Sequence, residues 1–215
     1  IGPLTNNIED AALLLEAIAG TDDFDRTVSS RLIEEYSKAK FANKPKRIAY
    51  IKECLENKGL DVEIKQLIED KLVKLKEEGH VVEPISFPYL DYLVPTYYVI
   101  TTAEASSNLA RFDGVHYGYR SKNITDLEST YINSRTEGFG EEVKRRIMLG
   151  TFVLRAGYHD AYFTKAQKIR RLIQDKTNEM FKNYDFVISP TTPHTPFEIG
   201  TKHTDPTIMY LEDIF

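Results

Sequence analysis

The chain has 215 residues, of which 41% are hydrophobic, 28% charged and 11% aromatic. This composition is typical of a globular domain and excludes a disordered chain. The 28 lysine and arginine residues stand against 33 aspartate and glutamate residues, a formal charge of −5. The chain therefore lacks the basic excess of most nucleic-acid-binding modules. Its single cysteine, Cys54, excludes an internal disulfide and a cysteine-based metal site.

The N-terminal part of the sequence predicts one helix followed by a connector. Asn7 can cap a helix over residues 8–19, whose apolar residues recur at helical spacing, and Gly20 stands where that helix should stop. Residues 21–45 predict the connector, with a short solvated helix over 31–40.

The next segment predicts a strand, a helix and a second strand. Residues 47–51 form a short apolar run, and residues 61–78 carry their apolar side chains in one helical stripe. Residues 81–88 predict the second strand. Because this segment is long enough for a helical crossover, we expect the two strands to pair in parallel. The sequence therefore predicts an α/β fold.

The middle of the chain predicts a helix followed by a turn region. Residues 89–111 are dense in apolar and small side chains, which indicates a buried helix. Residues 112–120 are rich in glycine and tyrosine and predict turns, which often carry function.

The last third of the chain predicts two helices and a third strand. A short helix is expected over residues 126–135 and a long one over 141–184, with a break at Gly157. Acidic residues at the start of the long helix suit the helix dipole. Residues 185–189 predict a buried strand, and the Pro/Thr-rich loop over 190–196 ends it.

The residues by themselves give few candidates for a catalytic or binding site. The phosphate-binding loop, the zinc-protease motif and the nucleophile elbow are absent from the sequence, and the five histidines lack ligand spacing, so we expect no metal. Ser106 and Ser107 lie in a helical pattern without a neighbouring base, which favours a structural role. The basic run over residues 144–146 offers a guanidinium fork for a carboxylate but also suits a solvated helix face. Asp213 is either a ligand carboxylate or a helix cap.

Several short motifs, spread over the whole chain, carry a family resemblance. They are Ile1–Pro3, Glu9–Leu15, Tyr97–Ile100, Glu104–Leu109 with Arg111–Gly114, Tyr117–Arg120, Glu137–Ile147, Leu149–Thr151, Gly157–Tyr162, Lys165–Lys168, Pro190–Pro193, Asp205–Pro206 and Met209–Tyr210. These motifs resemble the amidase-signature family, and within it the glutaminase (GatA-type) subunits of tRNA-dependent amidotransferases.

The resemblance implies an α/β/α sandwich around a mixed sheet covered by helices. Residues 1–215 are then a single incomplete domain, the central to C-terminal portion of that sandwich. Because the missing portion leaves sheet edge and core uncovered, we expect this chain by itself to self-associate.

The resemblance also implies an activity and partners. Enzymes of this kind hydrolyse glutamine and pass the ammonia to GatB. GatB uses ATP and Mg²⁺ to convert Glu-tRNA(Gln) into Gln-tRNA(Gln), and GatC joins the two subunits. We therefore expect this chain to bind no cofactor and to reach misacylated tRNA only through its partner. Because no stretch of the sequence approaches the roughly 18 consecutive apolar residues of a membrane helix, we also expect it to be cytoplasmic with no membrane contact.

The resemblance assigns binding residues to this chain but no catalytic residue. The family's nucleophilic serine, its second serine and its lysine lie before the Ile1–Pro3 motif, so we expect the 215-residue chain to be inactive alone. Tyr97 is implied to line the glutamine pocket, Arg146 to hold the α-carboxylate and Asp213 to pair with the α-ammonium. Arg145, on a different helical face, is the natural comparison for Arg146.

Three readings stay open at this point. The first is the glutamine-hydrolysing subunit, which in some organisms also serves Asp-tRNA(Asn). The second is an amidase of the same family that acts alone on a small amide. The third is a binding or scaffold module without catalytic activity.

Overall fold

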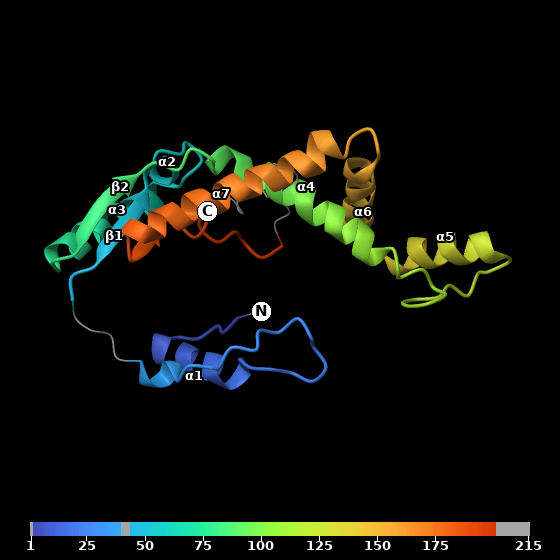
Figure 1. Cartoon of the computed structure of the whole chain (residues 1–215), viewed down its shortest axis with the longest axis horizontal. Helices are drawn as coiled ribbons and strands as arrows, with labels where there is room; N and C mark the ends of the chain where they lie inside the picture. Colours follow the sequence, from blue (N-terminus) through green and yellow to red (C-terminus); the bar gives the residue numbers. More distant parts are fainter. Residues whose placement is uncertain (1, 40–43, 201–215) are drawn as a thin grey trace. The chain divides into compact units, whose positions relative to one another are not determined.

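The computed structural model describes residues 2–39 and 44–200, and its internal contacts divide the chain into two units, residues 1–44 and 45–215 (Figure 1). The prediction of one incomplete domain stays a prediction.

The first unit contains the helix predicted at the N-terminus. α1 (Ile8–Ile18) begins after Asn7, whose side-chain oxygen accepts the backbone N–H of Asp10 at 2.7 Å. Of the second helix predicted in this unit, one turn forms, η1 (Tyr36–Lys38). The Glu16 carboxylate joins the two elements, because it accepts the backbone N–H of Ser37 at 3.1 Å and its hydroxyl at 2.7 Å.

The second unit is built around a parallel sheet of three strands in the order β2-β1-β3. The strands are β1 (Arg47–Ile51), β2 (Val81–Ile85) and β3 (Phe186–Ile188). Both neighbours of β1 pair with it in parallel. The crossover between β1 and β2 contains α2 (Lys52–Leu55) and α3 (Val62–Glu77). The predicted parallel strand–helix–strand unit is thus confirmed.

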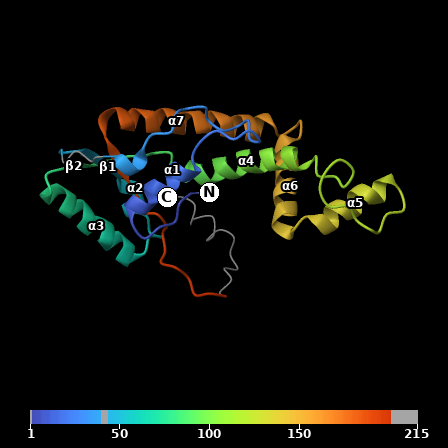
Figure 2. The same ribbon diagram turned by 90° about the horizontal axis from the view of Figure 1, so that it is seen from below.

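Helices cover both faces of this sheet. On one face, Leu72 of α3 packs in a buried cluster with Ile48 and Val82. On the other, Met180 of α7 (Lys165–Asn183) packs in a second cluster that includes Phe87. Figure 2 shows α3 and α7 on opposite sides of the strands. Burying each of these side chains contributes about 2 kcal/mol. The predicted α/β fold with covering helices is confirmed, whereas the three strands that the structure describes are all parallel and do not form the mixed sheet that the resemblance implies.

The start of α3 allows a direct test of one helix cap. The Asp61 carboxylate accepts the backbone N–H groups of Glu63 at 2.8 Å and Ile64 at 3.4 Å. We expect Asp61→Ala to lower the free energy of unfolding by about 1 kcal/mol, because these N–H groups lose their acceptor. Asp61→Asn keeps an oxygen at that place and should change little. Urea unfolding of the purified protein checks both, and an equal loss in the two variants would contradict the capping role.

The remaining helices extend from the sheet (Figure 1). They are α4 (Leu90–Leu109), α5 (Leu127–Gly138) and α6 (Glu141–Leu154). The expectation that the first of these is a buried helix holds only in part, because most of its side chains are half-buried or exposed. None of the helices in the described part of the chain is long and apolar enough to cross a membrane.

The long helix predicted over 141–184 is divided close to the expected break at Gly157. After α6 the chain turns and enters η2 (Asp160–Thr164), a π-helical turn that leads directly into α7. The wider turn is visible in the backbone, because the N–H of Thr164 donates to the carbonyl oxygen of His159 at 3.0 Å.

Candidate functional site

The crossing of α4 and α6 positions the predicted binding residues. Gly150 of α6 is buried against Thr102 of α4, which is 2% exposed. A Cβ atom on Gly150 would overlap the carbonyl oxygen of Thr102. The hydroxyls of Ser106 and Thr151 are 3.0 Å apart across the same crossing. The two backbones therefore touch here, one turn away from Tyr98 on α4 and from Arg146 on α6.

Arg146 lies one turn before Gly150 and meets the aromatic pair of α4. Its guanidinium carbon is 5.6 Å from the centre of the Tyr98 ring, a distance at which a cation is attracted to the ring face. Its Nε donates a hydrogen bond to Glu142 at 2.9 Å. This hydrogen bond is the main cause that raises the pKa of Arg146, and a hydrogen bond to Tyr97 acts in the same direction. Arg146 is thus a charged donor that is hydrogen-bonded to Glu142 and lies over the Tyr98 ring.

Tyr97 lies beside Arg146. Its ring meets that of Tyr98 edge to face at 5.2 Å, and Tyr97 is 47% exposed. Two of the three predicted binding residues are therefore neighbours in the structure. The third, Asp213, lies outside the described residues.

Arg145 and Arg146 differ in exposure but share a partner. The side chain of Arg145 is 57% exposed and that of Arg146 33%. Arg145 donates to Oε2 of Glu142 at 2.6 Å, while Arg146 donates to Oε1 of the same carboxylate. The two arginines are thus less independent than their helical faces suggested, because residues three and four positions after Glu142 can both reach it.

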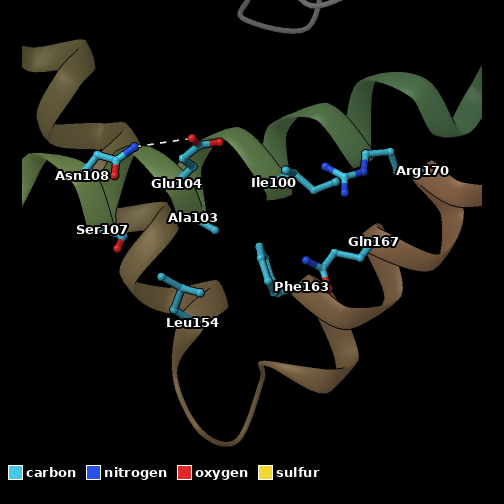
Figure 3. Close-up of a pocket in the computed structure, with 9 residues that line it drawn as sticks. All are labelled: Ile100, Ala103, Glu104, Ser107, Asn108, Leu154, Phe163, Gln167 and Arg170. Carbon is cyan, nitrogen blue, oxygen red and sulfur yellow. Dashed lines mark hydrogen bonds between the residues drawn. The ribbon is translucent and has the colours of Figure 1, made fainter. Parts of the chain in front are cut away.

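A separate cavity of 330 Å³ opens between α4, the end of α6 and the start of α7 (Figure 3). Ile100, Ala103, Leu154 and Phe163 give it apolar walls. Its polar residues are Glu104, Ser107, Asn108, Gln167 and Arg170. Tyr97 and Arg146 are not among its lining residues, so the predicted binding pair lies on another part of α4 and α6.

A hydrogen-bonded network holds the glycine- and tyrosine-rich turn region against α5, directly before α6. Glu137 accepts hydrogen bonds from the Tyr119 hydroxyl at 2.9 Å and the Ser121 hydroxyl at 3.0 Å. The backbone N–H of Ser121 donates to the buried hydroxyl of Ser134 at 3.1 Å. Gly114 has a φ of 79°, and a Cβ there would overlap the Ser134 side chain. The region is thus tied to the helix that leads into α6.

This network predicts a pH-dependent stability. The hydrogen bond from Ser121, followed by that from Tyr119, lowers the pKa of Glu137. A carboxyl group with a lowered pKa in the folded state stabilises the fold above its ordinary pKa, about 4.3. The stabilisation is lost as the pH falls through the folded-state value. We therefore expect Glu137→Gln to be less stable than the original protein at pH 7, and the difference to shrink below about pH 4. Urea unfolding at both pH values checks this, and a constant difference would contradict it.

Two contributors to the site were not identified from the sequence. Glu142 was interpreted only as an acidic residue that suits the helix dipole, although its spacing of four residues from Arg146 was a usable signal. Tyr98 follows Tyr97 in an apolar helix, and the sequence alone gives no reason to distinguish it. Its contact with Arg146 depends on how α4 crosses α6.

The structure offers little for metal or thiol chemistry. Among residues 2–39 and 44–200, no three histidine, cysteine, aspartate or glutamate side chains are placed to hold a metal ion. Cys54 is 1% exposed, and burial raises the pKa of its thiol to about 11. A thiol with so high a pKa is a poor nucleophile at neutral pH.

Comparison with known proteins places this chain in a family. The Amidase family model matches residues 1–215. The chain is 49% identical to the GatA-type subunit of the glutamyl-tRNA(Gln) amidotransferase of Clostridium botulinum (strain Loch Maree / Type A3), with all of this chain and 44% of that protein covered. The corresponding protein of Chlorobium phaeobacteroides is 48% identical, with 45% of its length covered.

A solved structure agrees with these relatives. The crystal structure of the same amidotransferase subunit from Thermotoga maritima superposes with a TM-score of 0.68 at 39% identity, over all of this chain and 41% of that one. The chain thus spans less than half the length of the relatives it matches. Since the family model matches along its whole length, the chain belongs to the amidase family.

Proposed function

We propose that this chain is part of the glutamine-hydrolysing GatA-type subunit of a Glu-tRNA(Gln) amidotransferase, in which it binds the amino-acid end of glutamine. The observation that carries the proposal is the placement of Arg146 between Glu142, Tyr97 and Tyr98 at the α4–α6 crossing. Relatives that carry the name of this subunit, at 49% and 48% identity, support it.

The chemistry of Arg146 suits the α-carboxylate of glutamine. A guanidinium group presents a planar fork of N–H donors that matches the two oxygens of a carboxylate. Tyr97 contacts this guanidinium, and its hydroxyl hydrogen can be donated to the same carboxylate. Asp213 is proposed to pair with the α-ammonium. Recognition of both charged groups would select free glutamine over a simple amide, since the simpler molecule lacks the carboxylate and ammonium groups that these residues are proposed to bind.

Hydrolysis itself is assigned to residues that this chain does not contain. The family's serine nucleophile and its base act on the glutamine side-chain amide. The ammonia is then passed to GatB, which uses ATP and Mg²⁺ to convert Glu-tRNA(Gln) into Gln-tRNA(Gln) for translation. GatC joins the subunits, misacylated tRNA is bound by the partner, and the complex works in the cytoplasm.

The test is an assay of the full-length protein purified with its two partner subunits. We expect formation of Gln-tRNA(Gln) that depends on glutamine, ATP and the complete complex. A full-length protein that hydrolyses simple amides alone, and never supports this conversion, would instead be a stand-alone amidase. Glutamine binding without hydrolysis in the complete complex would make it a binding module.

A further inference from the structure

Glu142 is held between Arg145 and Arg146, the second of which belongs to the predicted binding pair. Its Oε2 accepts from Arg145 at 2.6 Å and its Oε1 from Nε of Arg146 at 2.9 Å. Both oxygens of the carboxylate are thereby used, and the side chain is fixed although it is half exposed. An exposed ion pair of this kind contributes little to the stability of a protein. A role in orienting one of the two arginines accounts better for the arrangement.

We infer that Glu142 is a positioning residue for glutamine binding, which holds the guanidinium of Arg146 in the orientation that receives the α-carboxylate. The inference rests on the proposed function. An arginine side chain has several rotatable bonds and loses about 2 kcal/mol of rotamer entropy when it is ordered. Since Glu142 takes the Nε–H group, Arg146 can direct its terminal amino groups at a ligand. Preorganisation of this kind strengthens binding without a new contact to the ligand.

The charge of Glu142 could act in the opposite direction, by repelling a bound carboxylate. The two roles are separable by substitution. Glu142→Ala removes both the charge and the hydrogen-bond acceptor, whereas Glu142→Gln removes the charge but keeps an oxygen that can accept from Nε of Arg146. A positioning role therefore predicts that Glu142→Ala weakens glutamine binding and that Glu142→Gln retains most of the original affinity. A repulsive role predicts that both variants bind glutamine more tightly.

The adjacent Glu141 provides the matched control. It lies in the same first turn of α6 and is exposed, so Glu141→Ala removes the same charge from the same helix end. The Nε of Arg146 donates to Glu142 and not to Glu141. The charge at the start of α6 should therefore change equally in the two alanine variants. Only Glu142→Ala should change the orientation of Arg146.

The experiment measures kcat and KM for glutamine in the full-length protein assembled with its partners. We expect Glu142→Ala to raise the KM about tenfold, the effect of losing one charge-assisted hydrogen bond, with kcat retained. Glu142→Gln should raise it less than about threefold, and Glu141→Ala should leave it unchanged. With 4-aminobutanamide, an amide substrate that lacks the α-carboxylate, Glu142→Ala should have no effect, whereas general damage to α6 would lower activity on both substrates.

The outcomes separate this inference from the proposed function. If Arg146→Ala raises the KM for glutamine while Glu142→Ala behaves like Glu141→Ala, the positioning role is wrong and the proposed function stands. If Arg146→Ala itself has no effect, the proposed binding site is wrong. A loss in Glu142→Ala that persists in the Arg146→Ala background would also overturn the inference, because a residue that acts through Arg146 has no effect without it.

Discussion

Replacement of Arg146 by alanine is expected to raise the KM for glutamine about 100-fold in the assembled full-length protein. The variant loses a charged, forked donor, and a hydrogen bond to a charged group is worth about 1.5–3 kcal/mol. Two such bonds, partly screened at a side chain that is 33% exposed, correspond to about 2.7 kcal/mol in binding. Steady-state kinetics with glutamine and direct titration calorimetry check the value.

Arg145→Ala is the control for this prediction. It removes the same positive charge from the adjacent position but leaves the hydrogen bond between Glu142 and Nε of Arg146 in place. We expect a change in KM of less than about threefold, consistent with an exposed ion pair. An equal loss in both variants would mean that the effect is bulk charge, and Arg146 would then have no special role.

The second large effect is expected at Gly150, where α4 and α6 cross. In Gly150→Ala the new methyl group would overlap the backbone carbonyl of Thr102, and no change of rotamer can relieve an overlap with backbone. The helices must separate, at a cost of about 3 kcal/mol. About 1 kcal/mol is regained because alanine favours a helix more than glycine does, so we expect a net loss of about 2 kcal/mol of unfolding free energy.

Gly157→Ala is the matched control, because the space around a Cβ atom at Gly157 is open. Its unfolding free energy should change by less than about 0.5 kcal/mol. Gly150→Ala should also raise the KM for glutamine, since the crossing sets the distance between Arg146 and the tyrosine pair. A variant as stable as the original protein would show that the two helices can move apart freely, and would contradict the account of the crossing.

The parts of the fold that could be predicted from the sequence are those that depend on local pattern. The apolar stripe of α3 and the two apolar runs beside it were sufficient to predict the parallel strand pair. Asn7 and Gly20 marked the ends of α1 for the same reason, because caps act within a few residues of the helix end. The short helix expected over 31–40 formed only one turn. Its apolar side chains Leu32 and Ile33 are exposed, and a short helix without tertiary packing is marginally stable.

The site was less predictable because its geometry depends on contacts between distant segments. Arg146 and Tyr97 were assigned from family motifs, and no periodicity in the sequence places them together. Their proximity follows from the approach of Gly150 to Thr102, residues 48 positions apart in the sequence. A glycine inside a helical pattern indicates that another segment packs closely against the helix, but the sequence does not show which segment this is. The roles assigned to Tyr97, Arg146 and Asp213 stay predictions until binding is measured.

Because of the π-helical turn η2, the number of residues between α6 and α7 determines how the chain before η2 is oriented relative to α7. A π turn holds one residue more than an α turn, and each residue of a helix accounts for about 100° of rotation. Deleting one residue from Asp160–Thr164 would let the turn close as an ordinary α-helix with no broken loop. The deletion would, however, rotate the chain that precedes η2 by about 100° relative to α7. The stacked rings of Phe152 and Tyr158, 4.6 Å apart, would then face a different direction. Homologues that differ by one residue at this place should therefore differ in which surface they present beside α6, even where their sequences on both sides are the same.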